Sequence, residues 1–396
     1  MMKVLELVRH LRALRSAPSK AVVKRVATIL PDYLLGNGSS RALVNITLEV
    51  TYRCNVKCEF CFLKDSVLNQ KRDELTHQEV ARLADQAMPY GAAFFITGGE
   101  PFLRRDLPEM ISAIKSRGLR VGVNTNGLLV DEKRGAAIRE AGLDYIIFSL
   151  HGPREVHDCL ENRRGSFDQV MSHLTAFSRR KGSTRVIANC VVAKQNADRL
   201  SEVPALLAHI PLDAVTFQHE TFLTAGEVAA HEEVWKVLFP QRPLPMVFQS
   251  SGYGRRDFGA LDREIDTIQT KNRKWPFPVF FKPFLQGKKL RSWYTSDMDV
   301  KGRCLYIWTD TRVEPDGTVN ACQVMPTPMG NVRENSLEEI LNGTLYREFR
   351  AKNREIGGVF PACARCCKLY RNPMNFAARQ PKWKTRGVVV ESQPSS

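Results

Sequence analysis

Short apolar or alternating runs recur along the first 220 residues, and a segment with helical character separates each run from the next. The first run, Val44 to Val50, alternates apolar and polar side chains, as a half-buried strand does. Similar runs lie at 94–96, 119–123, 145–148, 185–192 and 213–217. Strands that alternate with helices form parallel sheets. The pattern therefore predicts an α/β fold, and six units without a doubly wound signature predict a partial (β/α)6, TIM-like barrel.

Polar pairs three residues apart mark the expected starts of several helices. In such a pair a Ser, Thr or Asp caps the first turn, and a Glu or Gln completes the capping box. The pairs are Thr76 with Glu79, Asp106 with Glu109, Ser166 with Gln169 and, later in the chain, Ser336 with Glu339. Each pair predicts a helix that begins at or directly after its first member.

Four of the predicted strands are followed by loops of unusual composition. Three cysteines follow the first strand, and the stretches Gly98–Pro101, Asn124–Gly127 and Ser149–Gly152 follow the second, third and fourth. The carboxyl ends of parallel strands share one rim, where active sites form in such folds. We therefore expect these four loops to meet at one functional site.

Length and composition limit the class of protein. The 396 residues are 43% hydrophobic and 25% charged, enough to bury one large core or two. The N-terminus has no secretory apolar region, and no stretch reaches the roughly 18 apolar residues of a membrane span. Ten cysteines are too few for a disulfide scaffold, so we expect a cytoplasmic protein whose clustered thiols bind metal.

The chain is strongly basic, with a formal net charge of +16, and residues 1–30 hold seven Lys or Arg against one Glu. This balance fits a nucleic-acid partner, an anionic membrane or an acidic substrate, and equally a solvated basic helix. Leu5, Val8, Leu11 and Leu14 follow a helical spacing, which would allow peripheral membrane contact.

The cysteine trio Cys54, Cys58 and Cys61 has one ligand fewer than a structural zinc site requires. A cubane [4Fe–4S] cluster has four irons, so three thiolates leave one iron open for a small molecule. The C-x3-C-x2-C spacing after the first barrel strand, with Phe60 before the third cysteine, resembles the radical S-adenosylmethionine (SAM) superfamily.

The resemblance implies that the open iron binds SAM and that one electron cleaves it to a 5′-deoxyadenosyl radical, which abstracts hydrogen from a substrate. It further implies a flavodoxin- or ferredoxin-type electron donor. Gly98, Gly99 and Glu100 resemble the family's G-G-E-P loop, in which Glu100 would accept hydrogen bonds from the SAM ammonium. Phe60, Asn126 and Ser149 resemble further cofactor contacts, and Arg163 or Arg164 either holds the SAM carboxylate or is a surface charge. No catalytic residue is assigned.

A second cysteine set lies in the last third of the chain. Cys304 precedes a predicted hairpin turn, 314–318, and Cys322 follows it; Cys363, Cys366 and Cys367 come later. The set resembles a SPASM/Twitch domain, in a shortened form that implies one auxiliary [4Fe–4S] cluster on Cys304, Cys322, Cys363 and Cys366. Cys367 would replace Cys366 or lie near the substrate, and a zinc ribbon is the alternative for the set. Cys159 and Cys190 receive no role.

The expected organisation has five parts. These are a basic N-terminal helical segment at 1–43, a radical SAM barrel core at 44–220, a connecting or substrate region at 221–300, an auxiliary-cluster domain at 301–372 and a disordered tail at 373–396. Gln218, His219 and Glu220 leave the sixth strand on the active rim as candidate substrate contacts. The aromatic, proline-rich stretch 274–281 is either inter-domain core or the wall of a substrate channel.

Three functions fit the sequence. The first is maturation of a ribosomal peptide by crosslinking, oxidation or epimerisation, although about forty residues before the first strand leave no room for a leader-binding domain. The second is oxidation of a lipid or another small molecule. The third is a non-enzymatic scaffold that binds iron–sulfur clusters or zinc and has a basic nucleic-acid surface, which the Gly98–Glu100 loop disfavours. We expect the oxidoreductase functions, with nucleic acid an unlikely partner.

Overall fold

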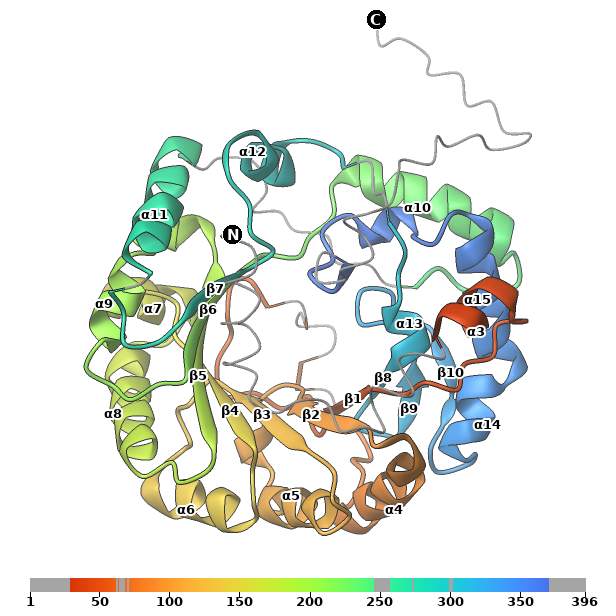
Figure 1. Cartoon of the computed structure of the whole chain (residues 1–396), viewed down its shortest axis with the longest axis horizontal. Helices are drawn as coiled ribbons and strands as arrows, with labels where there is room; N and C mark the ends of the chain where they lie inside the picture. The colour runs from red at the N-terminus through yellow and green to blue at the C-terminus, as the bar shows by residue number, and fades with distance from the viewer. Residues whose placement is uncertain are drawn as a thin grey trace, which may run out of the picture.

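The structure is a computed structural model that describes residues 29–61, 63, 68–69, 71–245, 257–272, 274–298 and 302–369. One ten-stranded sheet has the order β10-β9-β8-β1-β2-β3-β4-β5-β6-β7. The strands are β1 (Asn45–Glu49), β2 (Ala93–Thr97), β3 (Val121–Thr125), β4 (Tyr145–Ser149), β5 (Arg185–Val192), β6 (Ala214–His219), β7 (Val279–Lys282), β8 (Asp310–Val313), β9 (Thr318–Asn320) and β10 (Pro328–Asn331). All neighbours from β8 through β1 to β7 are parallel. The predicted partial barrel is confirmed, because the sheet curves without closing (Figure 1).

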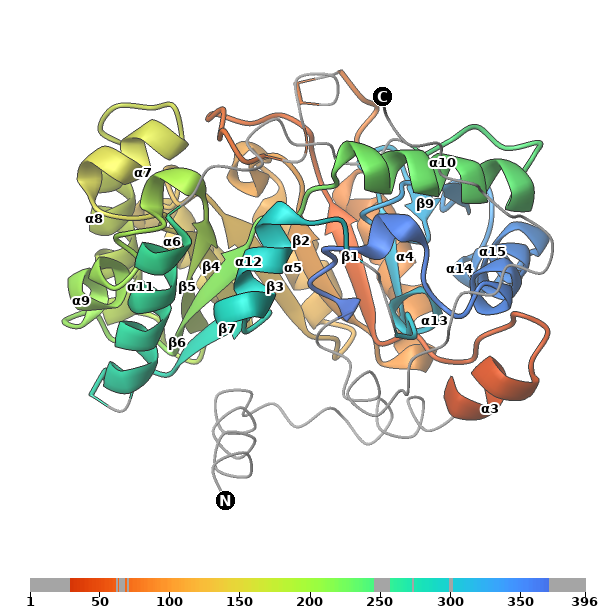
Figure 2. The same cartoon turned by 90° about the horizontal axis from the view of Figure 1, so that it is seen from above.

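The helices are α3 (Ile29–Leu35), α4 (His77–Ala87), α5 (Leu107–Lys115), α6 (Glu132–Glu140), α7 (Arg154–Leu160), α8 (Ser166–Arg179), α9 (Glu202–Leu207), α10 (Ala225–Leu238), α11 (Phe258–Lys271), α12 (Gly287–Thr295), α13 (Tyr306–Thr309), α14 (Leu337–Asn342) and α15 (Thr344–Glu355). Of these, α4, α5, α6, α8, α9 and α11 lie outside the curved sheet (Figures 1 and 2). Short 3-10 turns η1 (Met88–Tyr90), η2 (Pro101–Leu103), η3 (Lys194–Asn196) and η4 (Pro361–Cys363) complete the set.

Each barrel strand has one face on the core and one face on the interior of the barrel. In β5, the residues alternate between half-buried and fully buried along the whole strand. The buried set includes Val186, Ala188 and Cys190, which join the core cluster formed between the sheet and the outer helices. Apolar burial of this kind stabilises a fold by about 25 cal/mol for each Å² removed from water. The half-buried face of β5 carries Arg185, Ile187, Asn189 and Val191, so it is both polar and apolar.

The helix starts expected at Thr76 and Ser336 are confirmed as reciprocal capping boxes. The other two helices form with different caps. Asp106 precedes α5, but its carboxylate accepts from Arg104 instead of capping the helix. Ser166 is the first residue of α8 rather than its cap, and the carboxylate of Asp158 accepts from Gly165 N and Phe167 N.

Strand β7 was not predicted, because its stretch is short and lies beside Pro276 and Pro278. Proline removes a ladder hydrogen bond and is confined to edge strands or strand ends. Among the described strands, β7 is such an edge strand and pairs with β6, where Thr216 lies opposite Phe280. Part of the aromatic stretch 274–281 is therefore barrel wall.

The C-terminal hairpin continues the barrel sheet. The predicted turn 314–318 joins β8 to β9, with Gly317 at a φ of +88°, and β8 pairs in parallel with β1. Asn45 lies opposite Asp310, and Thr47 lies opposite Arg312. This pairing brings the second cysteine set to the side of the first barrel strand.

Several expectations concern residues outside the described ranges. They include the helix through Leu5 to Leu14 with its membrane contact, and the tail at 373–396. Within the part of the chain that the structure describes, no helix is long and apolar enough to cross a membrane.

Candidate functional site

The first cysteine trio lies on a loop directly after β1 that is anchored at several backbone positions. Cys54 N donates to Asn69 Oδ1 at 3.1 Å, and Cys61 N donates to Cys58 O at 3.1 Å. Two further amides of the loop, Lys57 N and Glu59 N, donate to the carbonyls of Glu161 and Leu160 at the end of α7. The three thiols therefore share one loop whose path is fixed by β1 and α7.

Partial burial changes the chemistry of these thiols. It raises the pKa of Cys54 to about 11, and it raises the pKa of Cys58 further, helped by the nearby Glu161 carboxylate. A metal cluster would displace these protons, since the thiolate is the ligand. Among the described residues, no group of three His, Cys, Asp or Glu side chains converges on a single metal ion.

The two glycines after β2 are required by the cysteine loop. A Cβ at Gly98 would lie 2.3 Å from Thr51 O, and a Cβ at Gly99 would lie 2.1 Å from Arg53 O. Gly98 also has a φ of +130°, which favours glycine. Gly99 N donates to Thr51 O at 2.7 Å. The glycines therefore let the loop after β2 pack on the backbone that leads to Cys54.

Glu100 joins the loops after β2 and β3. Its carboxylate is buried and accepts from Phe102 N at 3.0 Å, Thr125 Oγ1 at 2.8 Å and Asn126 N at 2.8 Å. Burial raises its pKa to about 7 against the lowering effect of these donors. Within the described residues Oε2 accepts one hydrogen bond, from Asn126 N, so a lone pair remains for a further donor. The role of Glu100 as acceptor for an ammonium group stays a prediction.

The other expected cofactor contacts gather around the cysteine loop. Asn126 Nδ2 donates to Asn55 Oδ1 at 2.7 Å, which joins the loop after β3 to the cysteine loop. Phe60 packs edge-on against His151 with 4.7 Å between ring centroids, two residues beyond Ser149. The structure therefore brings the four predicted loops together at one rim.

The remaining predicted contact residues are Arg163 and Arg164, which are exposed, and His219, which is buried. Arg163 Nη1 donates to the Asn55 carbonyl at 3.1 Å. His219 Nδ1 lies 2.7 Å from the Tyr294 hydroxyl. Both contacts fix local structure, and substrate contact by residues 218–220 stays a prediction.

Sequence reasoning missed a buried polar group under the cysteine loop. His151 N donates to His157 Nδ1 at 3.1 Å, and His157 Nε2 lies 3.5 Å from Glu161 Oε2. All three side chains are almost fully buried, and burial lowers the pKa of His151 well below its usual range. The i,i+4 spacing of His157 and Glu161 was the available signal.

The second cysteine set lines one cavity. Its walls include Cys304, Cys322, Cys363 and Cys366, together with Tyr306, Gln323, Asn353, Phe360 and Lys368. Cys367 is buried but does not line this cavity. Cys366 therefore lies at the same cavity as the other three thiols, and its role as the fourth ligand stays a prediction.

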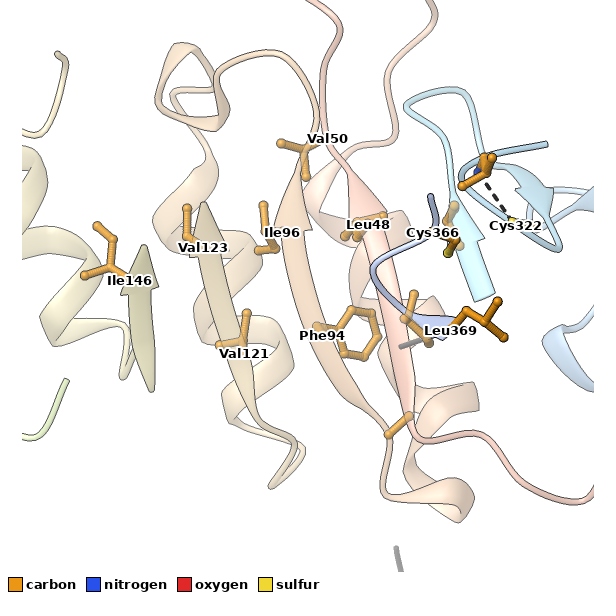
Figure 3. Close-up of a cluster of buried hydrophobic side chains, with 14 of the residues drawn as sticks. Leu48, Val50, Phe94, Ile96, Val121, Val123, Ile146, Cys322, Cys366 and Leu369 are labelled. Atoms are coloured by element: carbon orange, nitrogen blue, oxygen red, sulfur yellow. Dashed lines mark hydrogen bonds between the residues drawn. The ribbon is translucent and has the colours of Figure 1, made fainter. Parts of the chain in front are cut away.

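The four thiols lie close enough to affect one another. Burial raises the pKa of Cys304 to about 12, with a further contribution from Cys322. Burial also raises the pKa of Cys363, with Cys304 as the next cause, and that of Cys366, with Cys367 as the next cause. Val324 N donates to Cys322 Sγ at 3.3 Å, the contact drawn beside Cys366 in Figure 3. Such N–H to sulfur bonds stabilise a ligating thiolate.

A buried arginine inside the last cysteine motif was also missed. Arg365 forms an ion pair with Glu227 on α10, and both side chains are almost fully buried. Its Nε donates to Trp293 O at 2.5 Å, and Nη2 donates to Ser296 O at 2.7 Å. Arg365 therefore connects the loop of Cys363 and Cys366 to α10 and α12.

Two protein-family models match the chain at these two sites. The model of the radical SAM superfamily matches residues 48–207, and that of SPASM, an iron–sulfur cluster-binding domain, matches residues 304–367. The chain therefore contains a radical SAM domain and a SPASM domain. Its SPASM domain carries the second cysteine set.

Curated relatives of this radical SAM protein are distant. It is 28% identical over 206 residues to the Fe-coproporphyrin III synthase of Methanosarcina barkeri, which covers 52% of this chain and 51% of that protein. It is 28% identical over 247 residues to the GTP 3′,8-cyclase of Marinobacter nauticus, covering 60% and 74%. The match therefore spans about half the length of the synthase.

Solved structures share the fold. Streptococcus suis SuiB bound to S-adenosylmethionine has a TM-score of 0.59 at 17% identity and covers 83% of this chain and 71% of its own. Native anSMEcpe with bound AdoMet has a TM-score of 0.56 at 17% identity, covering 79% and 82%. A radical SAM domain and a SPASM domain together bind SAM and two [4Fe–4S] clusters. The described donors fit these groups, with three thiols on one loop and four around one cavity.

Proposed function

We propose that this radical SAM protein is an oxidoreductase that oxidises its substrate by two electrons, with the SPASM cluster as electron acceptor. The observation that carries the proposal is the cavity lined by Cys304, Cys322, Cys363 and Cys366. Four thiolates occupy all four irons of a cubane, so no iron is left to bind substrate. Electron transfer is the role that such a closed site can serve.

At the first site, Cys54, Cys58 and Cys61 would hold three irons of the other cluster. When bound, this cluster and SAM supply a 5′-deoxyadenosyl radical that abstracts hydrogen from the substrate. Gly98 and Gly99 keep the loop after β2 tight against the cysteine loop. The ionised carboxylate of Glu100 would accept from the SAM ammonium, while Asn126, Ser149 and Phe60 would contact the cofactor from the neighbouring loops.

At the second site, the surrounding residues set the charge near Cys322 and keep water out of the cavity. Burial raises the pKa of Cys322. Two effects oppose this rise, the hydrogen bond from Val324 N to Cys322 Sγ and the positive charges of Arg312 and Lys368. Both effects favour added negative charge on a cluster in the cavity. The buried walls exclude water from the acceptor. The residues therefore suit a site that takes up an electron.

Two substrate classes have support. SuiB has been solved bound to its precursor peptide SuiA, and anSMEcpe has been solved with the peptide Cp18Cys, which favours a peptide that is crosslinked, oxidised or epimerised. The Fe-coproporphyrin III synthase and the GTP 3′,8-cyclase are the curated relatives, which favours a small organic molecule, and a lipid belongs to this class.

We place the reaction in the reducing cytoplasm, because all ten cysteines are free thiols.

The radical chemistry can be tested without knowing the substrate. Anaerobically reconstituted wild type, supplied with dithionite and SAM, should release 5′-deoxyadenosine slowly. Cys58→Ala should abolish this release, because one cluster iron loses its ligand. Cys159→Ala is the matched control, since Cys159 is exposed and belongs to neither cysteine set. Equal release from all three proteins would overturn the proposal.

A further inference from the structure

Glu161 is a buried carboxylate at the C-terminal end of α7, where this helix meets the cysteine loop. Its side chain is 0% exposed. The loop is attached to this end of α7 on both sides of Cys58, because Lys57 N donates to Glu161 O at 3.3 Å and Glu59 N donates to Leu160 O at 3.0 Å. The middle cysteine of the first trio is therefore held beside Glu161.

The Glu161 carboxylate has no direct hydrogen-bond donor within the described residues, because neither of its oxygens accepts a bond there. The basic group that contacts it is His157, whose Nε2 lies 3.5 Å from Oε2, beyond the usual range of about 2.7–3.2 Å. Glu100 differs, since its carboxylate accepts from three donors of the neighbouring loops. Glu161 is thus the less compensated of the two buried carboxylates.

Backbone contacts keep the neighbouring histidines neutral. His157 Nδ1 accepts from His151 N at 3.1 Å, so this nitrogen has no proton, whereas an imidazolium has a proton on both nitrogens. His151 Nδ1 likewise accepts from Val191 N at 3.2 Å. The two histidines therefore place no positive charge beside Glu161.

The other charged side chains on these segments lie nearer to solvent. They are half-buried or exposed: Lys57, Glu59, Asp158, Arg163 and Arg164. Water and salt screen exposed charges, while a buried charge is screened much less. The charge of Glu161 therefore acts on its surroundings more strongly than these charges do.

We propose that Glu161 makes the cluster held by Cys54, Cys58 and Cys61 harder to reduce and, once it is reduced, a stronger electron donor to SAM. The inference rests on the proposed function, in which one electron passes from that cluster to the sulfonium of SAM. The cluster is oxidised by one electron, the C5′–S bond breaks, and methionine and the 5′-deoxyadenosyl radical result. An electron on the cluster is repelled by the Glu161 carboxylate, and this repulsion is relieved when the electron leaves.

The test is a redox titration of the anaerobically reconstituted protein, followed by electron paramagnetic resonance. The first cluster is identified because its signal changes when SAM binds at its open iron, and the closed auxiliary cluster has no such iron. Glu161→Gln removes the charge at nearly constant volume, and Glu161→Asp keeps the charge. Glu155→Gln is the matched control, because Glu155 is an exposed carboxylate on the same helix.

In Glu161→Gln, the equilibrium constant for one-electron reduction of the first cluster should rise about tenfold, which is a shift of about 59 mV to a more positive potential. Glu161→Asp and Glu155→Gln should keep the wild-type potential, and the auxiliary cluster should be unchanged in all variants. An unchanged or more negative potential in Glu161→Gln would overturn the proposal. An equal shift in Glu161→Asp or in Glu155→Gln would overturn it as well.

A second variant, Glu161→Met, decides the case in which the new glutamine amide disturbs the loop. Methionine has a similar length and no polar group, so it should give the same positive shift. Loss of iron from the first site in both variants would show that Glu161 builds the cysteine loop, and would overturn its role in setting the potential. Failure of the proposed function itself is distinguishable, because wild type would then show no cluster signal that responds to SAM.

Discussion

Arg312 on β8 and Glu49 on β1 form a buried ion pair, with 2.5 Å between Nη2 and Oε2 and side chains that are 3% and 2% exposed. Glu49 Oε2 also accepts from the Tyr52 hydroxyl at 2.9 Å, and Arg312 Nη1 lies 3.4 Å from Gln323 O. Tyr52 precedes Cys54 by two residues, and Gln323 follows Cys322. One charged pair therefore links the two cysteine loops across neighbouring strands.

Replacing one member of this pair should be costly. Arg312→Met leaves the Glu49 carboxylate buried without its partner, so we expect a loss of about 3–5 kcal/mol in the free energy of unfolding. Arg312→Met with Glu49→Leu removes both charges and should recover most of that loss. Denaturant unfolding of the reconstituted proteins measures both, with the exposed Arg179→Met as control. A double variant as unstable as the single one would contradict the expectation.

The same substitution should change the auxiliary cluster. Burial raises the pKa of Cys322, and the positive charge of Arg312 opposes that rise, so Arg312 acts electrostatically at the second cysteine set. Removing that charge should make the cluster harder to reduce, so its reduction potential should become more negative. Potentiometric titration followed by electron paramagnetic resonance measures this shift in a background where Cys54, Cys58 and Cys61 are alanine. An unchanged or higher potential would show that Arg312 does not tune the cluster.

Iron content should report the two sites separately. Wild type should hold about eight irons and eight sulfides per chain after anaerobic reconstitution, because it binds two cubanes. Replacing Cys54, Cys58 and Cys61 by alanine should leave about four irons on the SPASM cysteines. Metal and sulfide analysis makes the measurement. Stoichiometric zinc with almost no iron in wild type would refute the cluster assignment.

Glu100 should make SAM binding depend on pH. Its pKa is raised to about 7, so the carboxylate that would accept from the SAM ammonium is ionised above that pH and protonated below it. SAM affinity should thus be constant above about pH 7 and fall about tenfold for each pH unit below it. Glu100→Gln should weaken binding by about 1.5–3 kcal/mol at pH 8 and remove the dependence. Equilibrium binding across pH tests both, and wild-type affinity in the variant would exclude Glu100 from the site.

The SPASM cysteines should be needed for product but not for radical formation. Cys322→Ala removes one ligand of the electron acceptor and leaves the first cysteine trio intact. With the true substrate, we expect 5′-deoxyadenosine to form while product is lost, and wild type should consume SAM stoichiometrically with product. Both compounds are quantified under reducing conditions, with Cys159→Ala as control. Full product formation by Cys322→Ala would refute the electron-acceptor role and would leave the SPASM domain as a structural cover over the barrel.

Arg365 should hold the last two SPASM cysteines in place. Arg365→Met leaves Glu227 buried without its charged partner, so we expect about 3–5 kcal/mol less stability. Loss of its bonds to Trp293 O and Ser296 O should also loosen the Cys363–Cys366 loop. Iron content and thermal unfolding measure the two effects. Normal values for both would show that the ion pair contributes nothing to the site.

The sequence by itself determined the features that depend on local spacing. Six strands of the barrel, the loops after four of them and the capping boxes at Thr76 and Ser336 follow from short-range patterns. The two cysteine sets can also be recognised from the sequence, since cluster ligands from one loop have a fixed spacing. Residues that meet at one rim could be predicted because parallel strands place their carboxyl ends together.

Only the tertiary structure decided the contacts between distant segments. The parallel pairing of β8 with β1, the edge strand β7 beside two prolines and the place of Cys366 at the cavity depend on three-dimensional register. Likewise, Asp158 rather than Ser166 caps α8, and Arg365 forms an ion pair with Glu227 on α10. Such contacts are set by burial of charges and shared strand edges, which act through space and leave no periodic trace along the chain.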